Sequence, residues 1–191
     1  MSTTLITLIT MCSLSYPPEY EPIIDVAINN CPTKAASLID ISIVNDVVEI
    51  EIDFFNRYDM PLELRGMLLA AACLESGFNP RAKGDWTSDR RYARAIGILQ
   101  LWPWWESGRW GYKVNRKDPE ASAKAWMKHI VKQIPSVRKK CKPKSKSLLW
   151  IQAWVQAIRS PKPSGRCREK PKHLRFLRKF QKIQKRGKPK S

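Results

Sequence analysis

A short apolar run that ends in an acidic residue constrains this chain more than any other feature. Residues 68–74 (Leu-Leu-Ala-Ala-Ala-Cys-Leu) have the composition of an apolar helix, and Glu75 follows them directly, before the helix-breaking residues 76–80. A carboxyl group at this place has a low dielectric on one side and a loop-lined opening on the other. Because burial disfavours the charged form, we expect a raised pKa for Glu75, which suits a general acid.

The apolar periodicity around this run predicts a mainly α-helical fold. Residues 42–58 alternate like a strand but also place apolar side chains on one helical face, and we choose the helix because a helix-turn-helix then continues through Pro61. Another helix is expected at 121–133, with Asp118 as its N-cap and Pro135 as its end. Further helices are expected at 147–159 and in the basic amphipathic stretch 171–185.

The segments between these helices predict less regular structure. Residues 76–95 are rich in Gly, Asp and Arg, which is typical of a loop. Residues 96–101 form a short apolar piece that is expected to begin a helix, which Pro103 disturbs.

A length of 191 residues suits one domain with tails. Residues 1–41 contain several prolines and predict an irregular leader or linker arm. Residues 42–160 form the expected helical domain, and residues 161–191 form a basic amphipathic tail. We expect a monomer.

The charge of the chain is strongly divided along its length. Residues 1–80 carry a net charge of −8 and residues 81–191 carry +26. A half this basic implies an anionic partner, such as nucleic acid, anionic lipid or bacterial cell wall. Nucleic acid is the less expected partner, since the chain has no known RNA- or DNA-binding signature. The basic tail is either a solvated surface or a means of attraction to an anionic cell wall or membrane surface.

The cysteines and histidines do not predict a metal site. The five cysteines form no CxxC pair and only two histidines are present, so we expect neither a zinc site nor a cofactor. Cys73 is expected to be a small core residue. Cys141 and Cys167 flank one predicted helix, and whether they pair stays open.

Targeting signals are equally sparse. No apolar segment is long enough to span a membrane. The apolar run at residues 5–15 lacks the preceding positive residues of a standard signal peptide, so export by that route is not favoured.

Two motifs in the middle of the chain resemble a known family. Residues 75–82 (Glu-Ser-Gly-Phe-Asn-Pro-Arg-Ala) and residues 95–103 (Ala-Ile-Gly-Ile-Leu-Gln-Leu-Trp-Pro) resemble the lytic transglycosylases with the lysozyme-like fold. In that family a Glu-Ser pair precedes Asn-Pro-x-Ala, and a Gly-Leu-Met-Gln-like strip follows. The resemblance covers roughly residues 42–160, and it implies a lysozyme-like helical domain.

The resemblance also implies roles for single residues. Glu75 falls on the catalytic acid/base, and Ser76 would orient it or the substrate. Gln100 falls on the glutamine that lines the sugar-binding cleft, and Gly97 would let a sugar approach the bare backbone. A third family motif, similar to Ala-Tyr-Asn-Ala-Gly, is changed here to residues 153–157 (Ala-Trp-Val-Gln-Ala), in which Trp154 and Gln156 would contact substrate.

Two further features near these motifs have alternative interpretations. The aromatic residues at 102–105 predict either a stacking wall for sugar rings, with Trp104 or Trp105 as the contact, or core packing. Asp85 is either a solvated loop carboxylate or a second catalytic carboxylate, because the goose-type lysozymes, which are similar around the acid, place an aspartate in this loop to position water.

The expected activity is therefore cleavage of peptidoglycan between N-acetylmuramic acid and N-acetylglucosamine, with a 1,6-anhydro product. The alternatives are a lysozyme-type hydrolase that uses Glu75 and Asp85, a non-enzymatic cationic protein that binds cell wall or nucleic acid, and a catalytically decayed relative. A small basic muralytic domain suits a bacteriophage virion or a bacterial cell envelope.

Overall fold

The computed structural model describes residues 20–31, 39–89, 91–108, 111–159, 167 and 172–187. This part of the chain is mainly helical, as predicted, with one small hairpin. The elements are α1 (Glu21–Asn30), α2 (Ile41–Tyr58), η1 (Leu62–Leu64), α3 (Met67–Ser76), β1 (Lys83–Trp86), β2 (Ala93–Ile96), η2 (Pro103–Trp105), α4 (Pro119–Cys141), α5 (Lys146–Arg159) and α6 (Lys172–Gly187).

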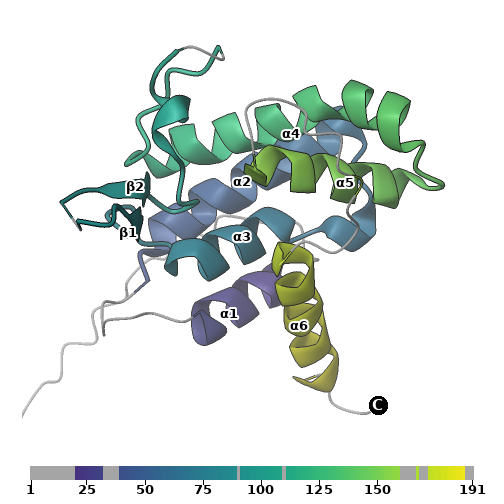
Figure 1. Cartoon of the computed structure of the whole chain (residues 1–191). Helices are drawn as coiled ribbons and strands as arrows, with labels where there is room; N and C mark the ends of the chain where they lie inside the picture. Colours follow the sequence, from purple (N-terminus) through teal and green to yellow (C-terminus); the bar gives the residue numbers. More distant parts are fainter. Residues whose placement is uncertain are drawn as a thin grey trace, which may run out of the picture.

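Helix α3 lies at the centre of the packing. All of its residues from Met67 to Cys73 are buried, as an apolar helix without a polar face requires. Helices α1, α2 and α6 pack against it, while α4 packs on α2 and α5. Figure 1 shows α2 and α4 crossing the molecule together, with α3 below them and with α1 and α6 at the lower edge.

The two longest helices begin where the sequence predicts. The Asp118 carboxylate accepts the backbone N–H of Ala121 at 2.9 Å and caps α4, and Asp40 caps α2 in the same way through Ser42. Residues 42–58 are helical rather than extended, because α2 buries the apolar stripe at Ile43, Val44, Val47, Val48, Ile50 and Phe54.

The predicted end of α4 at Pro135 is wrong, because the helix continues to Cys141. A proline inside a helix loses one backbone hydrogen bond and costs about 3 kcal/mol. Ile130 and Val137 are buried on either side of it, and α4 packs along α2 and α5. This packing offsets the local cost, so a tertiary effect overrides the helix-breaking signal.

The prediction that residues 1–41 form an irregular arm is wrong for Glu21–Asn30, which form α1. Ile23, Ile24 and Ala27 are buried, and α1 packs on α3 and α6. Cys73 is buried, as predicted, but it is also bonded to Cys31 at the end of α1. The second disulfide joins Cys141 and Cys167, the pairing that the sequence left open.

A hairpin replaces the predicted loop at residues 76–95. Strands β1 and β2 are antiparallel, with Lys83 opposite Ile96 and Trp86 opposite Ala93. Residues 96–101 are also not the start of a helix: Ile96 and Leu101 exchange backbone hydrogen bonds and close a tight turn. Both strands are four residues long and lack an apolar alternation, so periodicity does not indicate them.

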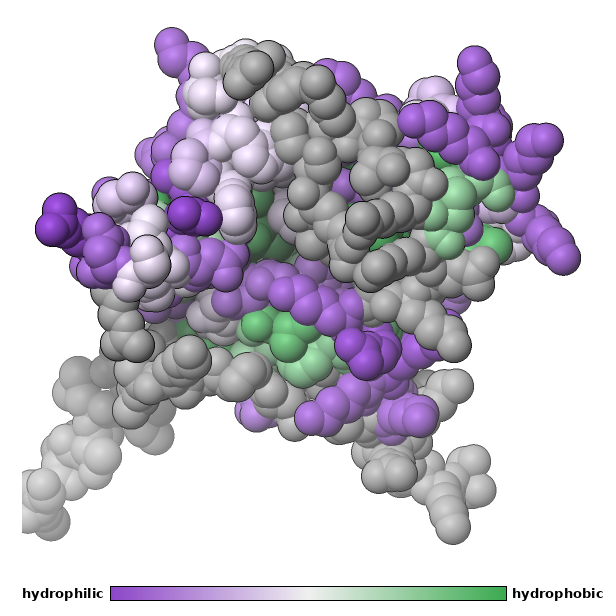
Figure 2. Space-filling view, viewed as in Figure 1, coloured by the Kyte–Doolittle hydropathy of each residue, from purple (hydrophilic) through white to green (hydrophobic). Residues whose placement is uncertain are grey.

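Helix α6 is the amphipathic helix predicted in the basic tail. Its residues Leu174 and Leu177 are buried where the helix packs on α1 and α3. Hydrophilic side chains surround a small apolar area on the face seen in Figure 2. Within the described residues, none of the helices has the length and apolar character that a membrane span requires.

A buried carboxyl group lies at the start of α3. Glu51 of α2 is fully buried, and its Oε1 accepts the backbone N–H of Leu68 at 3.1 Å. Burial raises the pKa of Glu51 to about 8, although the N–H groups at the start of α3 act in the opposite direction. The native carboxyl is therefore largely protonated at pH 7, whereas the unfolded one, with its ordinary pKa near 4.5, is ionised.

We expect Glu51→Gln to stabilise the protein at pH 7 but not at pH 4. The raised native pKa means that native Glu51 holds a proton that the unfolded chain releases, so its contribution to stability falls as the pH rises from about 4.5 to about 8. A neutral amide removes this cost, and the free energy of unfolding should rise by about 1–3 kcal/mol at pH 7. Urea denaturation at both pH values measures it, with the exposed Glu49→Gln as control. An equal gain at both pH values would contradict the assignment.

Candidate active site

The C-terminal end of α3 places Glu75 at the edge of the core. Gly77 ends the helix in the left-handed conformation (φ +63°), and its N–H bonds back to the carbonyl groups of Ala72 and Cys73. A residue with a Cβ is disfavoured in this conformation, so the sequence Glu-Ser-Gly fixes where the helix stops. Glu75 therefore projects from the last turn, half-buried between the apolar helix and the segments that follow.

Ser76 connects this helix end to the strip at residues 97–100. Its hydroxyl lies 2.9 Å from the carbonyl of Ile98 and 3.2 Å from that of Ala72. Gln100 adopts a positive φ of +50°, and its side-chain NH₂ donates to the carbonyl groups of Gly97 and Ala82. Both polar side chains predicted to serve the substrate thus also hold backbone segments together.

Gly97 has a different role from the one predicted. Its φ is +83°, and a Cβ there would lie 1.9 Å from the backbone oxygen of Arg116. The space beside this glycine is therefore filled by the protein's own chain. The structure thus corrects the prediction that a sugar approaches the backbone here. The glycine instead allows the turn at residues 97–100 to pack against the segment before α4.

Arg116 fixes the loops around the pocket, and no sequence motif indicated it. The side chain is buried, and its guanidinium donates to the carbonyl oxygens of Arg94 at 2.7 Å and Leu101 at 2.9 Å. It also pairs with Glu106 at 2.8 Å, which lowers the pKa of that carboxyl. One cation thus joins β2, the turn and the residues after η2.

These segments enclose a pocket of about 160 Å³ that contains Glu75. The polar lining comes from Glu75, Asp85 and Gln100, which the sequence predicted, and from Lys172 of α6. Asp85 accepts a hydrogen bond from the indole N–H of Trp102 at 3.0 Å. The rest of the lining is apolar and consists of Leu99, Leu101, Trp102, Trp104, Trp105 and Trp126.

The aromatic residues of the pocket belong partly to the core. Trp105 is buried and stacks on Trp104, with ring centroids 4.3 Å apart. Trp104 is half-buried, and Trp102 is exposed beside it. Both interpretations of this block therefore hold in part, and Trp102 and Trp104 present the accessible faces. Trp102 was not among the predicted contacts, although it lies in the same aromatic block.

The ionisation of Glu75 is opposite to the prediction. Its side chain is 14% exposed, and its Oε1 lies 2.6 Å from both His173 Nε2 and Lys172 Nζ. Burial alone raises the pKa of Glu75, but the hydrogen bonds from His173 and Lys172 and the charges of these two residues outweigh it, so the net pKa lies below the ordinary value. The sequence argument identified the burial correctly and missed the two donors, which come from a helix about one hundred residues later.

Two predicted substrate contacts are in the wrong place for that role. Trp154 and Gln156 are buried in α5 and do not line the pocket. Trp154 instead donates its indole N–H to His173 Nδ1 at 2.9 Å. It thus reaches Glu75 only through another side chain.

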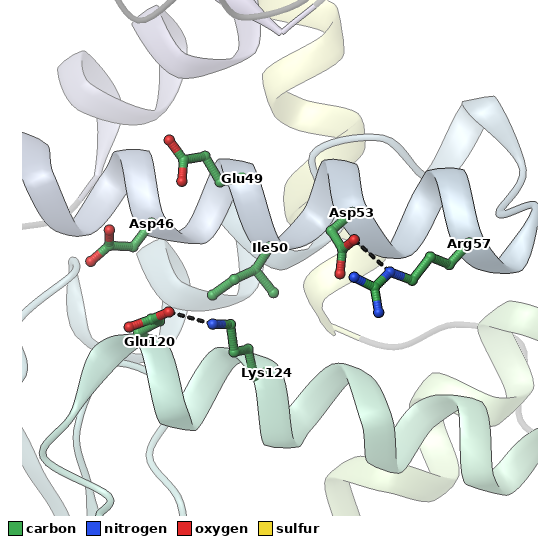
Figure 3. A pocket seen from close by; sticks show the side chains of 7 residues that line it. All are labelled: Asp46, Glu49, Ile50, Asp53, Arg57, Glu120 and Lys124. Carbon is green, nitrogen blue, oxygen red and sulfur yellow. Dashed lines mark hydrogen bonds and ion pairs between the residues drawn. The ribbon is translucent and has the colours of Figure 1, made fainter.

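A second cavity of about 310 Å³ lies between α2 and α4. Figure 3 shows Asp46 and Asp53 on the side of α2 that faces α4, whereas Glu49 points away from α4. Asp53 is paired with Arg57, and Glu120 is paired with Lys124. Burial and the nearby Glu120 raise the pKa of Asp46. Although this cavity is larger, it has no aromatic lining and its cations are already paired, so the Glu75 pocket is the better candidate. No group of three or more metal-binding side chains occurs within the described residues.

Comparison of the chain with protein-family models, with curated proteins and with solved structures finds no match. The chemistry of the site is therefore inferred from its own geometry.

We expect Gly97→Ala to destabilise the protein by about 2–5 kcal/mol, because the new methyl group would overlap the Arg116 carbonyl and force the backbone apart. Gly108→Ala is the matched control: its φ is also positive, but nothing lies within 4 Å of the added Cβ, so only the backbone strain of about 1 kcal/mol remains. Thermal unfolding of the two variants measures the difference. Equal losses would show that the close approach at Gly97 is unimportant.

Proposed function

We propose that this protein is a lytic transglycosylase that cleaves peptidoglycan, and that its helical domain is lysozyme-like. The observation that carries the proposal is the half-buried carboxyl group of Glu75 at the end of an apolar helix, inside a pocket lined by tryptophans. An aromatic pocket with few polar groups suits a sugar chain, since ring faces stack on the apolar faces of sugars. Glu75 of the first motif and residues 99–102 of the second motif both line this pocket.

In the proposed mechanism one carboxyl group serves twice. Protonated Glu75 donates its proton to the oxygen between N-acetylmuramic acid and N-acetylglucosamine, and the C1–O bond breaks. The N-acetyl group of the substrate stabilises the positive charge that develops at C1. Ionised Glu75 then takes the proton of the C6 hydroxyl as O6 bonds to C1, which closes the 1,6-anhydro ring and restores the acid. Water is not consumed, so a second carboxylate is not needed.

The rest of the pocket has supporting roles in this proposal. Trp102 and Trp104 provide faces for sugar rings. The amide group of Gln100 keeps the turn at residues 97–100 closed and lines the floor. Exposed basic residues on α4 and α6, including Arg138, Lys139, Lys140, Arg175, Arg178 and Lys179, would attract an anionic cell wall or membrane surface. Such a protein would act from a phage virion or within a bacterial envelope.

The position of Asp85 favours a second candidate, a lysozyme-type hydrolase. Asp85 lines the same pocket as Glu75, and its hydrogen bond to Trp102 orients the carboxylate. In a hydrolase it would position a water molecule for attack at C1. The two candidates differ in the products, since the hydrolase leaves reducing ends.

We expect the wild-type protein to release 1,6-anhydro-muramyl products from purified murein, and Glu75→Gln to lower kcat/KM by at least about a hundredfold, because the amide cannot donate the proton. Mass analysis of the digest measures both. Circular dichroism is the control for folding. Intact murein with wild-type protein would contradict the proposed activity and would favour a non-enzymatic wall-binding protein.

We expect Asp85→Asn to change the rate less than tenfold if the protein is a transglycosylase, since that route uses no positioned water. A loss similar to that of Glu75→Gln, together with reducing ends in the wild-type digest, would assign the protein as a hydrolase. Both variants are compared on the same murein at the same pH.

The activity should be greatest on the acidic side of neutrality. A general acid works only while it is protonated, and the net pKa of Glu75 lies below its ordinary value because of the donors on α6. We expect kcat/KM to fall as the pH rises through the pKa of Glu75. A profile that is flat from pH 4 to pH 8 would contradict the role of Glu75 as the acid.

A further inference from the structure

A chain of buried hydrogen bonds links α5 and α6 to Glu75. The indole N–H of Trp154 lies 2.9 Å from His173 Nδ1, and His173 Nε2 lies 2.6 Å from Glu75 Oε1. The His173 side chain has no exposed surface, and Trp154 is 1% exposed. The sequence did not link Trp154 or His173 to Glu75, yet their hydrogen bonds form a chain that ends at Glu75 Oε1.

The hydrogen bond from Trp154 determines which ring nitrogen of His173 carries the proton. An indole N–H is only a donor, so His173 Nδ1 must accept and carries no proton. The single ring proton of a neutral imidazole then lies on Nε2 and is donated to Glu75.

The contacts of Glu75 leave its two oxygens in different situations. His173 and Lys172 both contact Oε1. Within the described part of the chain, Oε2 has no hydrogen-bond partner. One oxygen is therefore held by α6, and no described residue competes with a proton or a ligand at the other oxygen.

We propose that His173 is a positioning residue whose tautomer is set by Trp154, and that it holds Oε1 of Glu75 so that Oε2 carries the transferable proton. This inference rests on the proposed function of Glu75 and adds a part that the resemblance to the family does not supply. Among the charged groups of the site, Lys172 contacts the same oxygen and Asp85 lines the pocket.

Packing holds the pair in place. Trp126 lies edge-on to both rings, with centroids 6.2 Å from Trp154 and 6.2 Å from His173. Trp126 also lines the Glu75 pocket, so one ring contacts both the hydrogen-bond chain and the space proposed for a sugar. A buried donor whose rotamer is fixed by its neighbours can set the direction of a carboxyl group. Lys172 is 50% exposed, so solvent screens both its hydrogen bond and its charge at Glu75.

The first test does not depend on activity. In the folded full-length chain at pH 7, ¹⁵N NMR should show the His173 ring protonated at Nε2 and bare at Nδ1. Because the chain has two histidines, a His129→Gln variant assigns the signals. Trp154→Phe removes the donor and should give a mixture of tautomers. A wild-type ring protonated at Nδ1, or a ring unaffected by Trp154→Phe, would overturn the proposal even if murein is cleaved.

The second test compares two substitutions of His173 on murein. His173→Gln retains an N–H that reaches Glu75, whereas His173→Phe retains ring size without a donor. We expect His173→Phe to lower kcat about ten- to hundredfold through misorientation, with a smaller change in KM. The alkaline limb of the pH profile should move to higher pH, because the pKa of Glu75 rises when its donor is lost. His173→Gln should restore both values toward those of wild type.

The controls separate positioning from folding. Glu49→Gln removes an exposed charge of α2 that does not line the Glu75 pocket, and it should change neither value. A purely structural role for His173 predicts that Gln and Phe are equally impaired with an unmoved pH limb, and that result would overturn the proposal. Failure of wild-type protein to cleave murein would remove the catalytic role proposed for Glu75, while the NMR measurement still decides the hydrogen-bond chain.

Discussion

The burial of α3 is the constraint on which the rest of the structure depends. A helix without a polar face must be covered on all sides, and α1, α2 and α6 supply that cover. Its polar side chains therefore lie at its C-terminal end, where Gly77 ends the helix and Glu75 leaves the core. The hairpin, the turn at residues 97–100 and the aromatic residues that follow are arranged around this end. The position of the acid is thus a consequence of core packing rather than of a local loop.

Two buried carboxyl groups show how much the partners of an acid matter. Glu51 and Glu75 both lose water on folding, yet the pKa of Glu51 is raised and that of Glu75 is lowered. For Glu51 the backbone N–H groups at the start of α3 and the charge of Arg65 do not compensate for full burial. Glu75 has the imidazole of His173 and the ammonium group of Lys172, both from α6. The tail therefore decides which protonation state of the candidate acid the fold favours.

The sequence predicts the helices whose apolar stripes are local, and it misses contacts that are distant along the chain. Residues 42–58 were placed correctly because one face is apolar over four turns. The predicted helix end at Pro135 and the predicted irregular arm at residues 1–41 were wrong, because packing partners far along the chain outweigh local propensity. Neither short strand carries a periodic signal.

The same distinction applies to the site. Glu75 and Gln100 come from two neighbouring motifs, Asp85 and Trp104 lie close to these motifs in the sequence, and all four residues line one pocket. His173 lies 98 residues from Glu75, and nothing in its own segment indicates what it contacts. Trp154 was predicted to contact a sugar because it lies in a changed motif. In the structure its indole N–H instead donates to His173. Arg116 looked like one of many basic residues, yet it is buried among carbonyl oxygens.

The disulfides give this arrangement a dependence on compartment. Cys31–Cys73 fastens α1 to α3, and Cys141–Cys167 joins the end of α4 to a residue shortly before α6. The first bond thus joins two helices directly, whereas the second joins α4 to Cys167, which precedes α6 in the sequence. Such bonds persist where thiols are oxidised and are lost in a reducing cytosol. A newly made chain would hold α6 against Glu75 by packing alone, and oxidation would then add a covalent link from α4 to the part of the chain that precedes the two donors.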